Sequence, residues 1–88
     1  MTPKSQGLNE HQARSQKALI EFLHADLDLC FTMLNSARMT RDPEHRRSAV
    51  DKVLAGMQVV RRLAVRIEDP QAAQGVCHRV NELERALD

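Results

Sequence analysis

The chain has 88 residues, a formal net charge of +1 and a hydrophobic fraction of 42%, which together argue for one small folded domain. The chain has thirteen Lys and Arg and twelve Asp and Glu. Because these charges nearly balance, the overall electrostatic potential does not favour nucleic acid, membrane or acidic partners. Trp and Tyr are absent and Phe occurs twice, so the aromatic anchors of binding hot spots and base-stacking platforms are missing.

The chain carries no feature typical of a secreted or membrane protein. Two cysteines are too few for a disulfide framework. Residues 1–15 are polar and lack the apolar core of a signal peptide, and the apolar runs are too short to span a bilayer. We expect a cytoplasmic, bacterial-type protein that does not bind membranes, with a disordered polar tail at residues 1–8 and one helical domain at residues 9–88.

The first predicted helix ends at Met39 and begins at Asn9 or at Ser15. The sequence Asn9-Glu10-His11-Gln12 has the form of a capping box, which favours the earlier start. Six positions form a heptad-like seam: Ile20, Leu23, Leu27, Cys30, Leu34 and Ala37. Further apolar positions widen the apolar arc to roughly 200°, about twice the width that one packing neighbour requires. We therefore expect this helix to contact at least two partners.

Two Asp-Pro pairs predict the starts of two more helices. Asp42-Pro43 and Asp69-Pro70 each place a capping carboxylate before a proline that tolerates the first helical position. The second helix is expected over residues 43–68 and the third over residues 70–87. The third has a narrow apolar stripe, made of Ala73, Val76, Val80, Leu83 and Leu87. No stretch alternates like a strand, so the predicted fold class is all-α.

The short connections favour antiparallel neighbours. They predict an up-down-up three-helix bundle, with a long helical hairpin and a shorter third helix. A first helix of ~45 Å would outrun a third helix of ~27 Å, leaving apolar surface of the first helix uncovered. A symmetric homodimer would cover that surface. We call the residues expected to form it the interaction face: Leu19, Phe22, Asp26, Leu29 and Met33.

Asp26 and Arg61 are charged residues placed among apolar positions of their helices. A buried carboxylate needs a partner, because otherwise its charged form is disfavoured. We predict a buried ion pair between the two that fixes helix register. An ideal helical hairpin places Asp26 nearer to Gly56 than to Arg61, so the Arg61 side chain would have to extend along the groove between the two helices to reach Asp26. The alternatives are that Asp26 lies at an interface between packed units or serves catalysis.

A second polar cluster on the first helix has the spacing of a metal motif. Glu21, His24 and Asp28 share one face, and Glu-x-x-His is the helical ligand spacing of ferritin-like sites. The motif occurs once and lies opposite the main seam, so a solvated polar face is the preferred interpretation and a shared surface zinc site the alternative. Cys30 is expected in the core, and Cys77 is expected to be the more reactive thiol.

No motif points to an enzyme. The chain has no CxxC, HExxH, glycine-rich phosphate loop or nucleophile elbow, so we expect no catalytic residue, cofactor or metal. The predicted function is a non-catalytic interaction or self-association module, whose partner is a second copy or another helical protein. The alternative is a nucleic-acid-binding accessory protein. It would use a basic stripe on the second helix, formed by Arg46, Arg47, Lys52, Arg62 and Arg66.

Overall fold

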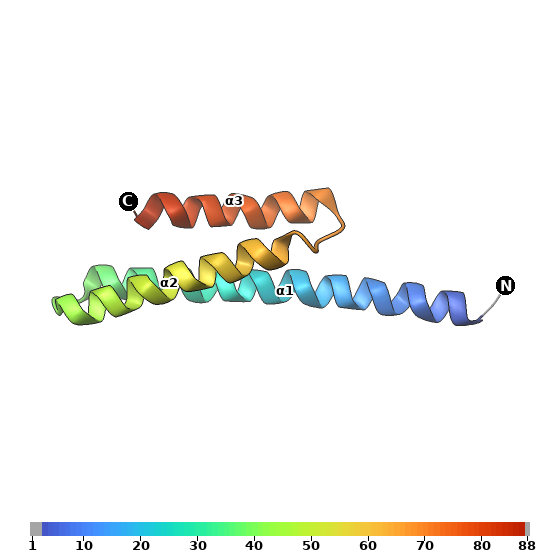
Figure 1. The fold of residues 1–88 in the computed structure, drawn as a ribbon, viewed down its shortest axis with the longest axis horizontal. Helices are drawn as coiled ribbons and strands as arrows, with labels where there is room; N and C mark the ends of the chain where they lie inside the picture. The colour runs from blue at the N-terminus through green and yellow to red at the C-terminus, as the bar shows by residue number, and fades with distance from the viewer. Residues whose placement is uncertain (1–2, 88) are drawn as a thin grey trace.

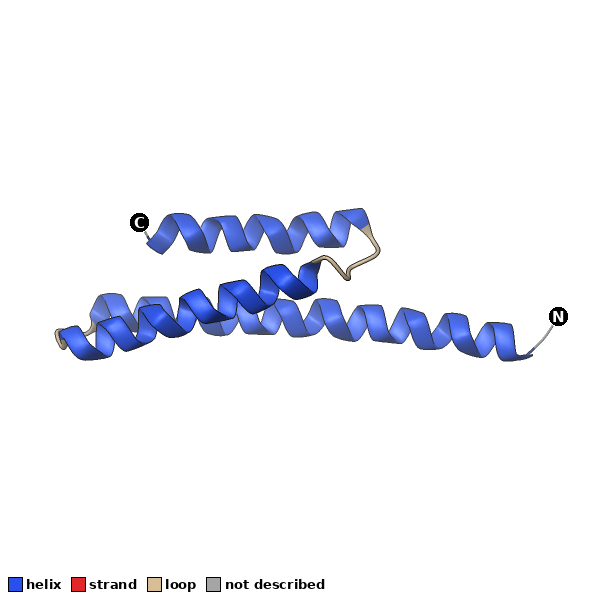
Figure 2. Cartoon of the chain, in the orientation of Figure 1, coloured by secondary structure: helices blue, strands red, loops and turns tan. Residues whose placement is uncertain are grey.

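The fold was obtained as a computed structural model that describes the backbone of residues 3–87 and the side chains of residues 12–87. Within these bounds the chain forms three helices and no strand: α1 (Pro3–Met39), α2 (Pro43–Ala64) and α3 (Pro70–Leu87) (Figures 1 and 2). The three helices pack against one another. The predicted all-α class and three-helix arrangement are therefore confirmed. No helix in the described part is long and apolar enough to cross a membrane.

The two Asp-Pro pairs begin α2 and α3, as predicted. The Asp42 carboxylate accepts a hydrogen bond from the amide of Glu44 at 3.0 Å, and Asp69 accepts one from the amide of Gln71 at 3.2 Å. Each carboxylate thereby satisfies an amide that has no partner within its own helix. These two short contacts fix where the second and third helices start.

The end of α2 was predicted too late. The helix ends at Ala64, four residues before Glu68. Two amides that follow the helix form i→i−3 hydrogen bonds, from Arg66 to the carbonyl of Leu63 at 3.0 Å and from Ile67 to that of Ala64 at 3.1 Å. Pro70 disfavours helical geometry in the residue before it. The chain therefore leaves the helix in time to turn back into α3.

The start of α1 was also predicted too late, because the helix begins at Pro3 rather than at Asn9 or Ser15. Proline is well suited to the first helical position, and no second proline interrupts the segment that follows. Residues 3–8, expected in a disordered tail, lie in α1, while residues 1 and 2 are outside the described part. At ~55 Å, α1 runs well past the end of the other two helices (Figure 1).

The core lies where the three helices meet. The largest fully buried side chains come from all three: Leu23, Leu27, Cys30, Val53, Val60, Val76 and Leu83. Five of the six predicted seam positions of α1 are buried, and Ile20 is half-buried. The wide apolar arc of α1 is shared between α2 and α3, which confirms that this helix needs two partners.

Gly56 permits the close approach of α1 and α2. A Cβ added at Gly56 would lie 2.7 Å from Sγ of Cys30 and 3.9 Å from Oδ2 of Asp26. The first distance is shorter than van der Waals contact, so only glycine fits at this crossing without displacing the cysteine. The role is steric, since Gly56 is helical with no positive φ. The tight crossing also fixes which residues of the two helices face each other.

Candidate interaction surfaces

The interaction face predicted on α1 is partly uncovered. Phe22 and Leu29 are 53% and 54% exposed, and their spacing of seven residues places them on the same side of the helix. Leu19, Asp26 and Met33 are half-buried. At its C-terminal end this face borders α2, where Met33 and Lys52 line one shallow groove of about 120 Å³.

The predicted buried pair between Asp26 and Arg61 is wrong. Asp26 lies beside Gly56, and Arg61 is exposed and forms an ion pair with Glu84 of α3. Gly56 and Arg61 are five residues apart, a rise of about 7.5 Å along the helix. Arg61 has turned toward α3 instead of bridging that distance. No charged side chain among residues 12–87 is fully buried, so Asp26 keeps access to water.

Arg79 of α3 contacts the polar cluster of α1, which consists of Glu21, His24 and Asp28. Arg79 forms an ion pair with Asp28, and its Nη1 lies 3.0 Å from Nδ1 and 3.3 Å from the carbonyl oxygen of His24. The guanidinium also lies 5.6 Å from the ring centroid of Phe31, within reach of a cation–π interaction. Because arginine has donors only, Arg79 is the donor in its contacts with His24.

The predicted solvated face is right for Glu21 and Asp28, which are exposed, whereas His24 is half-buried. Glu21 faces Lys17 at 4.0 Å. His24 and Asp28 also contact Arg79 of α3. Within the side chains that the structure describes, no three His, Cys, Asp or Glu gather closely enough to hold a metal ion. The sequence offered one signal for this contact, an arginine at the edge of the apolar stripe of α3.

Two further contacts tie the third helix and its connection to α1. Arg38 donates from Nη2 to the carbonyl oxygen of Ala86 at 2.7 Å, near the end of α3. Gln16 donates from Nε2 to the carbonyl of Arg66 at 3.0 Å and accepts from the amide of Glu68 at 2.9 Å. One amide side chain thus satisfies two backbone groups of the connection, which sequence periodicity could not reveal.

The basic stripe predicted on α2 is not one continuous row. Arg46 donates to the carbonyls of Ala37 at 3.3 Å and Thr40 at 2.9 Å, so it caps the end of α1. The other four members, Arg47, Lys52, Arg62 and Arg66, are exposed like Arg46, and Arg66 lies beyond the end of α2 at Ala64. Two of them share a shallow groove with acidic residues, since its lining includes Glu44, Arg47, Asp51 and Lys52. The positive charge is therefore interrupted where phosphates would have to lie.

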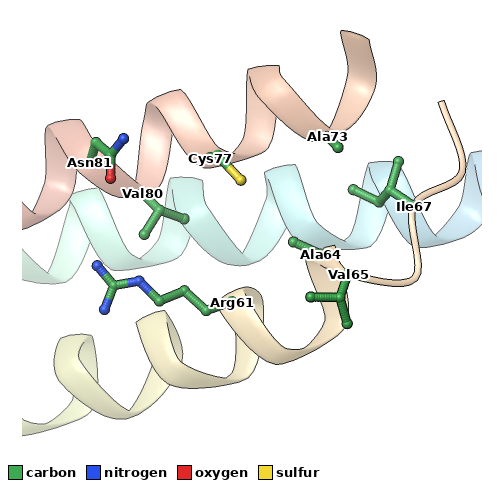
Figure 3. A pocket seen from close by; sticks show the side chains of 8 residues that line it. All are labelled: Arg61, Ala64, Val65, Ile67, Ala73, Cys77, Val80 and Asn81. Carbon is green, nitrogen blue, oxygen red and sulfur yellow. The ribbon is translucent and has the colours of Figure 1, made fainter. Parts of the chain in front are cut away.

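The two cysteines differ in their surroundings, as predicted. Cys30 is buried and Cys77 is exposed. Burial raises the pKa of the Cys30 thiol, and the nearby Asp26 carboxylate raises it further. Cys77 lies in a groove between α2 and α3 with a volume of about 380 Å³ (Figure 3). Sequence reasoning missed this groove, because the gap depends on how α3 is placed against α2.

No family model, curated protein or solved structure matches the chain.

Proposed function

We propose that this chain is a non-catalytic, cytoplasmic interaction module that binds a second copy of itself through the interaction face of α1. The observation that carries the proposal is the exposure of Phe22 and Leu29, two large apolar side chains each more than half open to solvent on one side of α1. Exposed apolar patches rimmed by polar residues are typical of protein-binding surfaces.

A second copy is a suitable partner because opposite charges lie within and beside the interaction face. Asp26 lies within the interaction face, and Lys52 lines the groove that Met33 shares with α2. A twofold symmetric interface places one patch against itself, so it requires complementary groups on the same surface. Asp26 of one protomer could then meet a lysine of its partner while the apolar side chains pack between them.

The test is light scattering coupled to size exclusion, at two protein concentrations and two salt concentrations. The expected result is a mass twice the 10.0 kDa of the chain, unchanged by salt because apolar contacts carry the association. Phe22→Glu should give a monomer. Met39→Glu is the matched control, since Met39 is 78% exposed on the same helix and lies outside the interaction face. Its variant should remain a dimer.

A monomer at every concentration would overturn self-association. Binding to a nucleic acid duplex that weakens steeply as salt rises would support the alternative based on the exposed arginines of α2. Substituting Arg62 and Arg66 by glutamine should then weaken binding, whereas Phe22→Glu should not. The two readings therefore predict opposite sensitivities to the same variants.

A further inference from the structure

The groove between α2 and α3 has the size and lining of a small-molecule site. Its volume of about 380 Å³ falls within the range of about 300–1,000 Å³ that is usual for ligand pockets. Its wall is mostly apolar, and the lining residues are Arg61, Ala64, Val65, Ile67, Ala73, Cys77, Val80 and Asn81 (Figure 3).

The groove exists because small side chains line both of its walls. Ala64 lies on α2, and Ala73 and Cys77 lie on α3. None of these side chains is long enough to fill the space, although protein interiors are normally close-packed. The ion pair between Arg61 and Glu84 lies beside the groove, and Gln16 of α1 holds the connection between α2 and α3.

Two polar side chains gather toward one end of this apolar groove. In Figure 3, Arg61 and Asn81 lie at the end away from Val65 and Ile67. Within the described side chains, the hydrogen bond of the Arg61 side chain goes to Glu84 through Nη2. A guanidinium has five N–H donors, so donors remain for a ligand. The groove therefore combines an apolar wall with an end where Arg61, although paired with Glu84, still presents N–H donors.

We propose that the α2–α3 groove binds an amphiphile with a medium-length alkyl chain and a carboxylate head. The alkyl chain would lie along Ala64, Ala73 and Val80, and the carboxylate would accept hydrogen bonds from Arg61 and Asn81. The wall of α3 from Ala73 to Asn81 is about 12 Å long, which sets the length of chain that fits. This site is separate from the interaction face, and the proposal does not depend on self-association.

Decanoate, kept below its micelle concentration, is the probe. Titration followed by methyl NMR should give saturable shifts at the methyl groups of Ala64, Ala73 and Val80, with one ligand per chain. Cys77 provides an independent readout because its thiol lies in the groove wall. Bound decanoate should slow the labelling of Cys77 by a maleimide. Absence of saturable shifts, or shifts confined to residues around Phe22, would overturn the proposal.

Three variants test the two halves of the ligand separately. Ala73→Leu fills the apolar wall and should weaken decanoate binding by at least about tenfold. Arg61→Gln removes the charged donor and should weaken decanoate about tenfold, while leaving the affinity for decanol unchanged. Glu84→Gln is the matched control, since it breaks the same ion pair but keeps Arg61. It should bind decanoate at least as tightly as the original chain.

The control separates head-group recognition from a loosened α3. Equal losses in Arg61→Gln and Glu84→Gln would mean that the ion pair acts by holding the helix, and would overturn the role of Arg61 in recognition. Unchanged binding in Ala73→Leu would overturn the groove as the site. Circular dichroism of each variant establishes that the helices are formed before binding is measured.

Discussion

The two sides of α2 differ in how closely a neighbouring helix approaches. Against α1, Gly56 removes a side chain so that Cys30 can enter the crossing. Against α3, small side chains leave a groove of about 380 Å³. Small residues therefore produce opposite results in one helix. At Gly56 the missing side chain lets Cys30 of α1 lie close to α2, whereas Ala64, Ala73 and Cys77 leave space between α2 and α3.

The contacts that hold α3 against the α1–α2 hairpin differ from those that hold α2 against α1. Val76, Val80 and Leu83 bury the inner stripe of α3, while arginines hold its edges. Arg38, Arg61 and Arg79, one from each helix, all make contacts between α3 and the hairpin. The α1–α2 seam depends on shape, whereas the placement of α3 also depends on charge.

The largest expected effect comes from replacing the two helical glycines by alanine, which should lower the stability of the fold at Gly56 and raise it at Gly75. Gly56→Ala drives a Cβ against Cys30 and should destabilise the fold by about 1–2 kcal/mol, after the gain in helix propensity. Gly75→Ala should stabilise it by about 0.5–1 kcal/mol, because nothing lies within 4 Å of the added atom. Urea unfolding of both variants measures the difference.

Cys30→Ala in the Gly56→Ala background identifies the clash. If Sγ of Cys30 is the obstacle, the second substitution should cost less there than in the original chain. Equal costs in both backgrounds would place the origin of the effect elsewhere.

A smaller effect is expected at the charged edge of α3. Arg79→Gln removes the contacts to His24, Asp28 and Phe31 and should destabilise the protein by about 1 kcal/mol. Hydrogen exchange should increase mainly in α3, because the hairpin keeps its own core. Arg47→Gln, at an exposed arginine of α2, is the control and should change neither stability nor exchange. Uniform loss of protection in all three helices would contradict a separately held α3.

The smallest effect concerns the Cys30 thiol and pH. Burial and Asp26 raise its pKa in the folded protein, so the unfolded chain loses this proton first as pH rises. The stabilisation is complete below the range where an ordinary thiol ionises, and it is lost as pH rises toward the raised folded pKa. Urea unfolding at neutral and alkaline pH should show a decline that Cys30→Ala reduces. Cys77→Ala should leave the decline unchanged.

Most of the fold followed from local patterns. The Asp-Pro pairs located two helix starts because a cap needs only neighbouring residues. The seam from Leu23 to Ala37 predicted a buried face because helical spacing alone sets which residues align. The ends of the long elements were less accurate. The end of α2 depends on the turn that follows it and on the contacts that distant Gln16 makes with that turn.

The candidate sites followed less directly. Exposure of Phe22 and Leu29 agrees with an arc wider than the bundle can cover. The partner predicted for Arg61 was wrong because an arginine side chain can turn toward either neighbouring helix. Its choice of Glu84 depends on where α3 lies. Likewise, the contacts of His24 and Asp28 with Arg79 were not predicted. Arg79 lies 55 and 51 residues away from them in the sequence, and only the packing of α3 on α1 brings it close.

The sequence by itself determined the helical class, the two capped starts, the central apolar seam and the different environments of Cys30 and Cys77. Each of these rests on spacing or chemistry within a few residues. Tertiary structure alone decided the glycine crossing, the arginine contacts of α3 and the apolar groove beside Cys77. These depend on distances between helices, and such distances are set by the packing of all three helices together rather than by any one of them.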